Sequence, residues 1–417
     1  MLPEQETEVL ERFLRYVKID TQSDPESTSY PSTEKQKNLG RLLVDELHAM
    51  GIEDAELNEF GLVYATIPAT VPYEVPVFFL CAHMDTSPDY SGKDVNPQLF
   101  PLYDGGKLVL PQGGIVLDPA QHPDLAMQTG GTIITSDGST LLGADNKAGV
   151  AEIMATASYL MRHPDVPHGA IRILFTPDEE IGRGVDKVDV AKLNARFGYT
   201  IDGETRGHLE TETFSADAAT IYFTGVPAHP GFAKGRMRSA IKMAANFVSR
   251  LPVNTLSPET TEGMEGFVHP TSISGNLEQA KVDLIIRDFT IKGLQEKADM
   301  LRALVDGVLV DYPGTSAKVE IREQYRNMRE ILNQHPEVEE YAMEAMRRAG
   351  LTPVSSSIRG GTDGSRLSFM GLPCPNIFAG EHAFHSPYEW VSLEDMQYVV
   401  ASLVHLAQVV AGKAKTA

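Results

Sequence analysis

The chain has 417 residues, of which 42% are hydrophobic and 22% charged, a balance that excludes a disordered or collagen-like chain. Lysine and arginine together number 36 against 57 aspartates and glutamates, so the formal net charge is −21. Because a surface this negative repels phosphate groups, we expect neither nucleic acids nor anionic membranes as partners.

The cysteines and the start of the chain bear on the cellular compartment. Cys81 and Cys374 are too few for a disulfide framework and lie among apolar neighbours, which predicts core thiols in a reducing compartment. The first six residues lack the pattern of a signal peptide, and no apolar run approaches the roughly 20 residues that span a bilayer. We therefore expect a cytoplasmic protein.

Apolar periodicity predicts alternating helices and strands in the first half of the chain. Helical spacing occurs over residues 7–17, 32–50 and 146–162, and short apolar runs predict strands over residues 61–67, 76–82, 170–176 and 199–201. This alternation favours an α/β sandwich around a largely parallel sheet. The stretch from residue 87 to 131 is rich in Pro, Gly, Asp and Gln and has no clear assignment.

The pattern changes after about residue 214. Strands are predicted over residues 218–225, 267–274, 281–289 and 318–325, and helices over residues 237–251 and 294–308. Their order, β-α-β-β-α-β, is that of a ferredoxin-like unit. Helices follow again over residues 336–349 and 394–410. We expect a discontinuous α/β domain, residues 1–213 and 326–417, with an α+β domain inserted at residues 214–325.

Side chains that commonly bind metal ions gather at the ends of the predicted elements. Ligands collect at the carboxyl ends of strands in an open α/β sheet, and imidazole together with carboxylate suits Zn²⁺ and other divalent ions. The candidates are His83 and Asp85 after one strand, Glu179 and Glu180 after the next, Asp202 after a third, Asp145 before a helix, and His385 in a loop.

Several of these residues also have an ordinary structural explanation. Asp145 alone is a favoured helix N-cap, Glu179 and Glu180 alone form a solvated turn, and Asp202 before a glycine is typical of a turn. The shared position at strand ends and helix starts is what favours a common site.

Four segments then resemble a known family. Residues 82–88 (AHMDTSP), 141–145 (LLGAD), 175–180 (FTPDEE) and 359–364 (RGGTDG) are similar to motifs of the di-zinc metallopeptidases that include carboxypeptidase G and the aminoacylases, and above all of their tripeptide aminopeptidases. The likeness extends over essentially the whole chain. It implies a zinc-peptidase-like, three-layer α/β catalytic domain with an inserted ferredoxin-like lid.

The resemblance also implies residue roles. His83, Asp145 and Asp202 would hold one metal ion, and Asp145, Glu180 and His385 the second, with two Zn²⁺ per subunit that Co²⁺ or Mn²⁺ can replace. Asp at position 202, rather than Glu, goes with the aminopeptidase members. Asp85 matches the carboxylate that orients His83, and Glu179 matches the general base.

Four further residues resemble substrate contacts of the family. His229, in Ala-His-Pro-Gly, matches a lid histidine that contacts the oxyanion, and Asn276 matches another lid contact. Arg287 and Arg359 match positions that bind the substrate carboxylate, a task suited to the planar guanidinium. Either arginine is also compatible with a surface ion pair, and the choice between them stays open here.

Three places depart from the family pattern. Asn146 stands where related sequences carry a second aspartate, and residues 203–206 and 380–387 diverge. His382 therefore competes with His385 as the last ligand, although the sequence that follows favours His385.

These observations predict a tripeptide aminopeptidase that acts on short peptides with a free N-terminus. The alternatives are a related di-zinc amidohydrolase or carboxypeptidase, and a catalytically silent peptide-binding relative. A homodimer formed through the outer edge of the lid is compatible with the sequence.

Overall fold

The computed structural model describes residues 8–416 and divides into two compact units. One unit contains the described residues through Thr211, together with Met328–Ser356 and those from Thr362 onward; the other contains Glu212–Asn327 and Ser357–Gly361. The expected start of the first helix at residue 7 and the first six residues lie outside the described part. Among the described helices, none is both long and apolar enough to cross a bilayer.

An eight-stranded sheet forms the centre of the first unit, in the order β1-β2-β8-β3-β9-β16-β10-β15. The pairs from β8 through β3 and β9 to β16 are parallel, whereas β1, β2 and β10 join antiparallel. The four strands expected from the sequence are confirmed, and the central pairs are parallel as expected. The sheet as a whole is mixed, because its outer strands β1, β2 and β10 pair antiparallel. The strands are β1 (Glu56–Leu57), β2 (Val63–Ile67), β3 (Phe78–His83), β8 (Ile171–Thr176), β9 (Phe197–Gly203), β10 (His208–Thr213), β15 (Val354–Ile358) and β16 (Asn376–Phe378).

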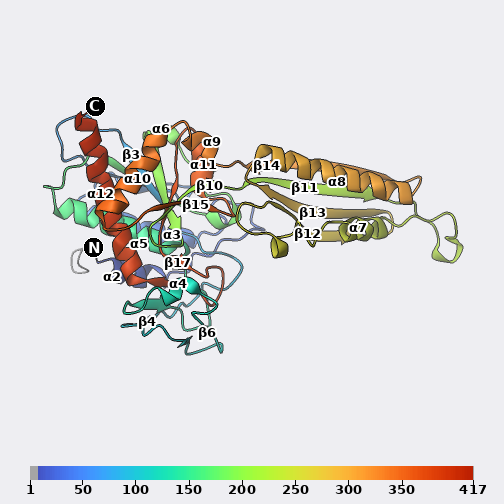
Figure 1. The fold of residues 1–417 in the computed structure, drawn as a ribbon, viewed down its shortest axis with the longest axis horizontal. Helices are drawn as coiled ribbons and strands as arrows, with labels where there is room; N and C mark the ends of the chain where they lie inside the picture. The colour runs from blue at the N-terminus through green and yellow to red at the C-terminus, as the bar shows by residue number, and fades with distance from the viewer. Residues whose placement is uncertain (1–7, 417) are drawn as a thin grey trace. The chain divides into compact units, whose positions relative to one another are not determined.

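Alternating side chains of this sheet enter two separate hydrophobic clusters, which makes the unit three-layered (Figure 1). Leu80 and Ala82 of β3 face the larger cluster, while Phe79 and Cys81 face the smaller one, which also holds the buried free thiol of Cys374. The helices of the larger cluster are α2 (Val9–Tyr16), α3 (Gln36–Ala49), α5 (Ala144–Arg162), α10 (Pro336–Arg348) and α12 (Leu393–Thr416); those of the smaller one are α6 (Val190–Leu193) and α11 (Asp363–Phe369).

The start of helix α3 differs from the sequence prediction, and the stretch that had no assignment now has one. Helix α3 begins at Gln36 rather than Ser32, because Ser32 gives its backbone N–H and its hydroxyl to Asp178. The stretch from residue 87 to 131, which had no assignment from the sequence, contains only short elements. These elements are too short to show a hydrophobic periodicity. They are β4 (Gln98–Phe100), β5 (Leu108–Val109), β6 (Val116–Leu117) and α4 (Pro123–Ala126); β4 joins a sheet with β7 (Ile133–Thr135), β17 (Glu381–His382) and β18 (Trp390–Ser392).

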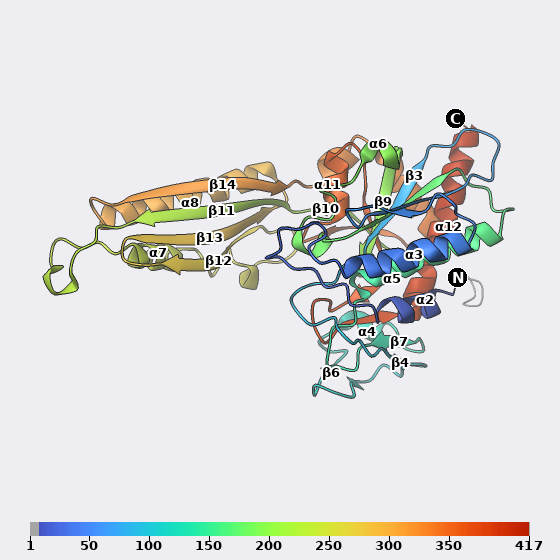
Figure 2. The same cartoon turned by 180° about the vertical axis from the view of Figure 1, so that it is seen from behind.

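The second unit is a four-stranded antiparallel sheet in the order β12-β13-β11-β14. Two helices, α7 and α8, pack against one face of this sheet around a core of their own (Figure 2). This order confirms the expected ferredoxin-like unit. Its elements are β11 (Ser215–Thr224), α7 (Ala240–Ser249), β12 (Phe267–Gly275), β13 (Gln279–Asp288), α8 (Ile291–Asp311) and β14 (Ser316–Tyr325).

Helix α5 places an acidic side chain, that of Glu152, in the hydrophobic core. Glu152 is fully buried, and neither of its carboxyl oxygens has a hydrogen-bond partner among the described residues. Burial, with a contribution from the nearby Asp395 carboxylate, raises the pKa of Glu152 well above its usual value. Its neutral form is therefore the one compatible with the fold.

We predict that Glu152→Gln stabilises the protein more at pH 8 than at pH 5. The folded-state pKa of Glu152 is raised, so its stability contribution is complete below about pH 4.3, its unfolded pKa, and is lost as pH rises through the folded value. Each unit of raised pKa corresponds to about 1.4 kcal/mol. Urea unfolding of both proteins at the two pH values measures the difference. Glu340→Gln on the exposed side of α10 is the matched control, and a Glu152→Gln effect that does not change with pH would contradict the prediction.

Candidate metal centre

The predicted metal ligands of the first unit meet at one edge of its sheet. Strand β3 ends at His83 and β9 carries Asp202, while Glu180 lies in η1 (Glu179–Ile181), the single 3₁₀ turn that follows β8. Because β8, β3 and β9 are parallel neighbours, their carboxyl ends coincide. Asp145 joins them from the start of α5.

Asp145 lies between two groups of possible ligands. Its Oδ1 is 2.9 Å from Nε2 of His83, and its Oδ2 is 3.1 Å from Nε2 of His385. Asp202 Oδ1 lies 3.4 Å from the same nitrogen of His83, and Glu180 Oε2 lies 2.8 Å from that of His385. The donor atoms within each group, His83–Asp145–Asp202 and Asp145–Glu180–His385, lie within 4.8 Å of one another. The structure therefore brings together the residues of both predicted ligand sets.

Asp85 connects His83 to the turn that carries the two glutamates. The backbone oxygen of Asp85 is 3.1 Å from Nδ1 of His83, and its carboxylate accepts hydrogen bonds from the backbone N–H groups of Glu179 and Glu180, at 3.0 and 3.2 Å. Glu179 Oε2 lies 3.9 Å from His83 Nε2. The buried Asp85 thus fixes the imidazole and the η1 turn relative to each other. The sequence indicated its contact with His83 but not its contact with the turn.

The pKa values of Glu179, Glu180 and His385 are all raised, but the physical cause differs between the two glutamates and the histidine. Burial raises the pKa of Glu180 to about 8, with Asp145 adding to the effect, and burial also raises that of Glu179 well above its usual range. Burial alone would lower the pKa of His385, but its hydrogen bonds to Asp145 and Glu180 raise it to about 11. The site as a whole attracts positive charge.

The donor set fits divalent metal ions. Two carboxyl oxygens, Oδ1 of Asp202 and Oε1 of Glu180, are buried and have no hydrogen-bond partner among the described residues. A buried carboxylate oxygen without a donor is costly, and a bound cation removes that cost. Imidazole nitrogens and carboxylate oxygens are ligands of Zn²⁺ and related ions.

Glu389 is a residue of the site that sequence reasoning missed. This buried carboxylate accepts three backbone N–H bonds from the turn that leads into α5: Leu142 at 2.7 Å, Gly143 at 2.8 Å and Asp145 at 2.9 Å. Burial raises its pKa to about 7, against the effect of these hydrogen bonds. No local pattern predicts a contact between positions this far apart in the chain.

His382, the competing ligand, belongs to neither group. Its ring stacks on that of Trp390, with 4.2 Å between the centroids, and burial lowers its pKa to about 3. The buried position of His382 is thus explained by its packing on the Trp390 indole, and the geometry favours His385 as the metal ligand.

The four predicted substrate contacts lie in the second unit, where each has local partners. His229 is exposed and accepts the Gly231 N–H at 3.1 Å, and the Asn276 side chain accepts two N–H groups of the β12–β13 turn. Nη1 of Arg287 donates to the backbone oxygens of Asp217 and Ile286 and, at 3.0 Å, to the Gln324 side chain. The Arg287 guanidinium also lies over the ring of Tyr325.

Arg359 donates through both Nη1 and Nη2, whereas the three hydrogen bonds of Arg287 all come from Nη1. Arg359 donates to the backbone oxygens of Gly263 and Glu265 at 2.9 and 2.7 Å and to the hydroxyl of Thr261 at 2.9 Å. Its guanidinium also lies over the rings of Phe214 and Phe267. These contacts fasten the loop before β12.

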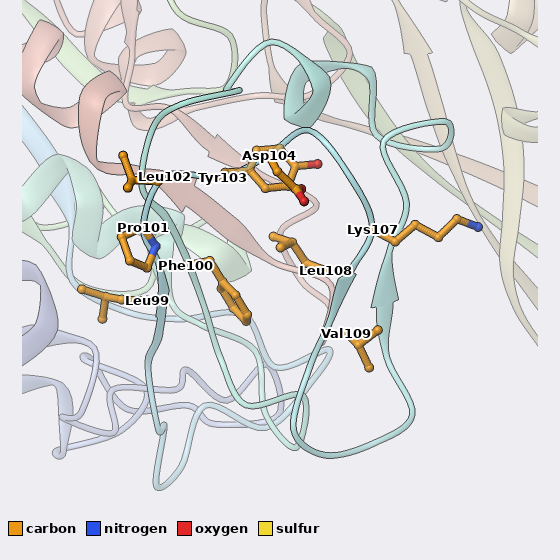
Figure 3. A pocket seen from close by; sticks show the side chains of 9 residues that line it. All are labelled: Leu99, Phe100, Pro101, Leu102, Tyr103, Asp104, Lys107, Leu108 and Val109. Atoms are coloured by element: carbon orange, nitrogen blue, oxygen red, sulfur yellow. The ribbon is translucent and has the colours of Figure 1, made fainter.

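A surface hollow of about 520 Å³ lies along the segment from Leu99 to Val109 (Figure 3). None of the predicted site residues lines it, and its charged lining residues are Asp104 and Lys107. Lys107 is paired with Asp118 at 2.6 Å. Its lining thus lacks the imidazole and carboxylate set that marks the metal centre.

Comparison with known proteins places this geometry in a family. The model of peptidase family M20/M25/M40 matches residues 138–409. Peptidase T of Geobacillus thermodenitrificans is 48% identical over 400 residues, which cover 96% of this chain and 97% of that protein.

Solved structures show that the fold is shared. A tripeptidase from Staphylococcus aureus has a TM-score of 0.77 at 23% identity and covers 99% of this chain and 100% of its own. A dinuclear metal-binding M20 peptidase from Bacillus subtilis has a TM-score of 0.66 at 16% identity, with 98% of each chain covered.

We predict that Glu389→Gln weakens metal binding about 10–100-fold, the usual range for a residue that orients a ligand. The amide can keep the bonds from Leu142 and Gly143 but turns an N–H₂ group toward the N–H of Asp145. Competition with a fluorescent zinc chelator measures the affinity. Wild-type affinity in the variant would show that Glu389 does not hold Asp145 in place.

Proposed function

Because the chain belongs to peptidase family M20/M25/M40, as its motifs predicted, we propose that it is a metallo-aminopeptidase that releases the N-terminal residue of tripeptides. The names of its relatives, Peptidase T and a tripeptidase, support this substrate class. The observation that carries the proposal is the position of Asp145 between two ligand groups, with Glu179 beside them.

Five side chains would bind the two metal ions, and a sixth, Asp85, would position them. His83, Asp145 and Asp202 would hold one divalent ion, and Asp145, Glu180 and His385 the other; we propose zinc, with Co²⁺ or Mn²⁺ as substitutes. When bound, such a pair of ions polarises the scissile carbonyl and lowers the pKa of the attacking water. Asp85 fixes the position of the His83 imidazole relative to the η1 turn.

Glu179 is the proposed general base. It belongs to neither ligand group, so its carboxylate stays available for proton transfer. It would accept the proton of the attacking water and pass it to the amine that leaves. Its side chain is 16% exposed, which limits the contact of the reacting groups with bulk water.

The second unit would supply the contacts to the far end of the peptide. Arg287 is the better candidate for the substrate carboxylate, because its hydrogen bonds to the protein use Nη1 alone, whereas Arg359 donates through both Nη1 and Nη2 to the loop at residues 261–265. His229 would contact the oxyanion and Asn276 the peptide. The domain limits, the cytoplasmic location and the homodimer remain predictions.

Glu179→Gln tests the proposed function. The amide preserves the shape of the side chain but accepts no proton, so kcat for a free tripeptide should fall about 10²–10⁴-fold while two metal equivalents remain bound. Activity and metal content are measured on the same sample. A kcat within a few-fold of wild type would assign the base elsewhere, and cleavage of N-acetylated tripeptides in preference to free ones would favour an amidohydrolase.

Arg287→Ala should lower kcat/KM for tripeptide acids about 10–100-fold, the loss expected for a charge-assisted hydrogen bond. The variant should also lose the preference of the wild type for a free carboxylate over the C-terminal amide. Arg302→Ala, which removes an exposed cation of α8, is the matched control. If Arg287→Ala keeps the full preference, Arg359 becomes the carboxylate ligand.

A further inference from the structure

The turn that carries Glu179 and Glu180 begins at a buried aspartate that the proposed reaction does not use. Asp178 is completely buried and adopts a left-handed backbone conformation, with φ 56° and ψ 24°. This conformation is uncommon for residues other than glycine, although aspartate tolerates it better than most. It sets the direction in which the chain leaves β8 and enters η1.

The side chain of Asp178 is held by a segment far away in the sequence. Its Oδ2 accepts the backbone N–H of Ser32 at 2.6 Å, and its Oδ1 accepts the Ser32 hydroxyl and the Gln36 amide, the latter at 2.7 Å. Gln36 also accepts the backbone N–H of Asp178 at 3.1 Å. Because Ser32 and Gln36 are buried, this network is shielded from water.

Further contacts join the same two segments beyond Asp178. Arg183 donates to the backbone oxygens of Ser27 and Ser29 at 3.1 and 2.6 Å, and the Tyr30 hydroxyl donates to Gly184 at 2.8 Å. Residues 27–36 therefore form a clasp on one side of the η1 turn. Asp85 holds the other side through the N–H groups of Glu179 and Glu180.

We infer that Asp178, through Ser32 and Gln36, is a positioning residue that sets the orientation of Glu179 and Glu180. The inference rests on the proposed function only in taking Glu179 as the base. The carboxylate of Asp178 accepts hydrogen bonds from Ser32 and Gln36, and Asp178 belongs to neither ligand group. A small rotation of the turn that it begins would displace the base from the attacking water, and a misplacement of about 1 Å can cost about 10²-fold in rate.

A double-mutant cycle tests this inference. Asp178→Asn turns an N–H₂ group toward the Gln36 amide, and Gln36→Glu sets two carboxylates against each other; each single change removes the pairing. In the double variant Asp178→Asn/Gln36→Glu, the new amide donates to the new carboxylate, and the Ser32 hydroxyl can rotate to accept. The pairing is restored with donor and acceptor exchanged.

We expect each single variant to lower kcat for a free tripeptide about 10–100-fold, with KM within about three-fold and two metal equivalents bound. The double variant should regain most of that loss. Asp189→Asn is the matched control, because Asp189 caps α6 and asparagine caps a helix equally well; its kcat should equal that of the wild type.

A kcat near that of wild type in metal-loaded Asp178→Asn would overturn the inference, as would a loss that the double variant does not recover. If Asp178→Asn does not fold, Gln36→Leu removes the contact without changing any residue of the turn, and it should likewise lower kcat. Glu179→Gln is measured in the same assay, so that the two proposals are tested separately. If Glu179→Gln retains activity, Glu179 is not the general base, whatever the result of the double-mutant cycle.

Discussion

Mutual repulsion between buried carboxylates is the constraint on which the catalytic unit depends. Asp145, Glu179, Glu180 and Asp202 meet at the ends of neighbouring strands with little contact with solvent. Bringing like charges out of water and together is unfavourable unless positive charge or hydrogen-bond donors compensate. Two imidazoles supply part of that compensation, and the proposed ions would supply the rest.

Other buried acids act on the backbone rather than on the reaction. Asp85 accepts the N–H groups of the η1 turn, Glu389 accepts those of the turn that leads into α5, and Asp178 accepts that of Ser32 in the clasp. Each carboxylate is matched by several donors, so it contributes order without adding an uncompensated charge. The ligands can then sit on rigid supports, as a metal site with defined geometry requires.

Much of this arrangement is readable in the sequence. Strands β3 and β8 are apolar almost throughout because helices cover both faces of the sheet, and the polar residues that follow them mark its carboxyl edge. The ferredoxin-like order follows from regular strands and amphipathic helices of ordinary length. Local periodicity is strong in all of these elements.

The parts that could not be predicted depend on contacts between distant residues. Gln36 begins α3 because Ser32 bonds to Asp178, and Glu389 reaches a turn preceding Asp145. Strands such as β4 and β17, two or three residues long, exist only through their partners. The packing of His382 on Trp390, which favours His385 as the ligand, is likewise a tertiary contact.

The most direct test of the central claim is a metal titration followed by both binding and activity. Protein depleted of metal by EDTA, and verified by elemental analysis, should not hydrolyse a free tripeptide, and activity should return with saturation at two equivalents of Zn²⁺, Co²⁺ or Mn²⁺ per chain. Full turnover by verified metal-free protein, or saturation of binding at two equivalents with no activity toward any short peptide, would contradict the account.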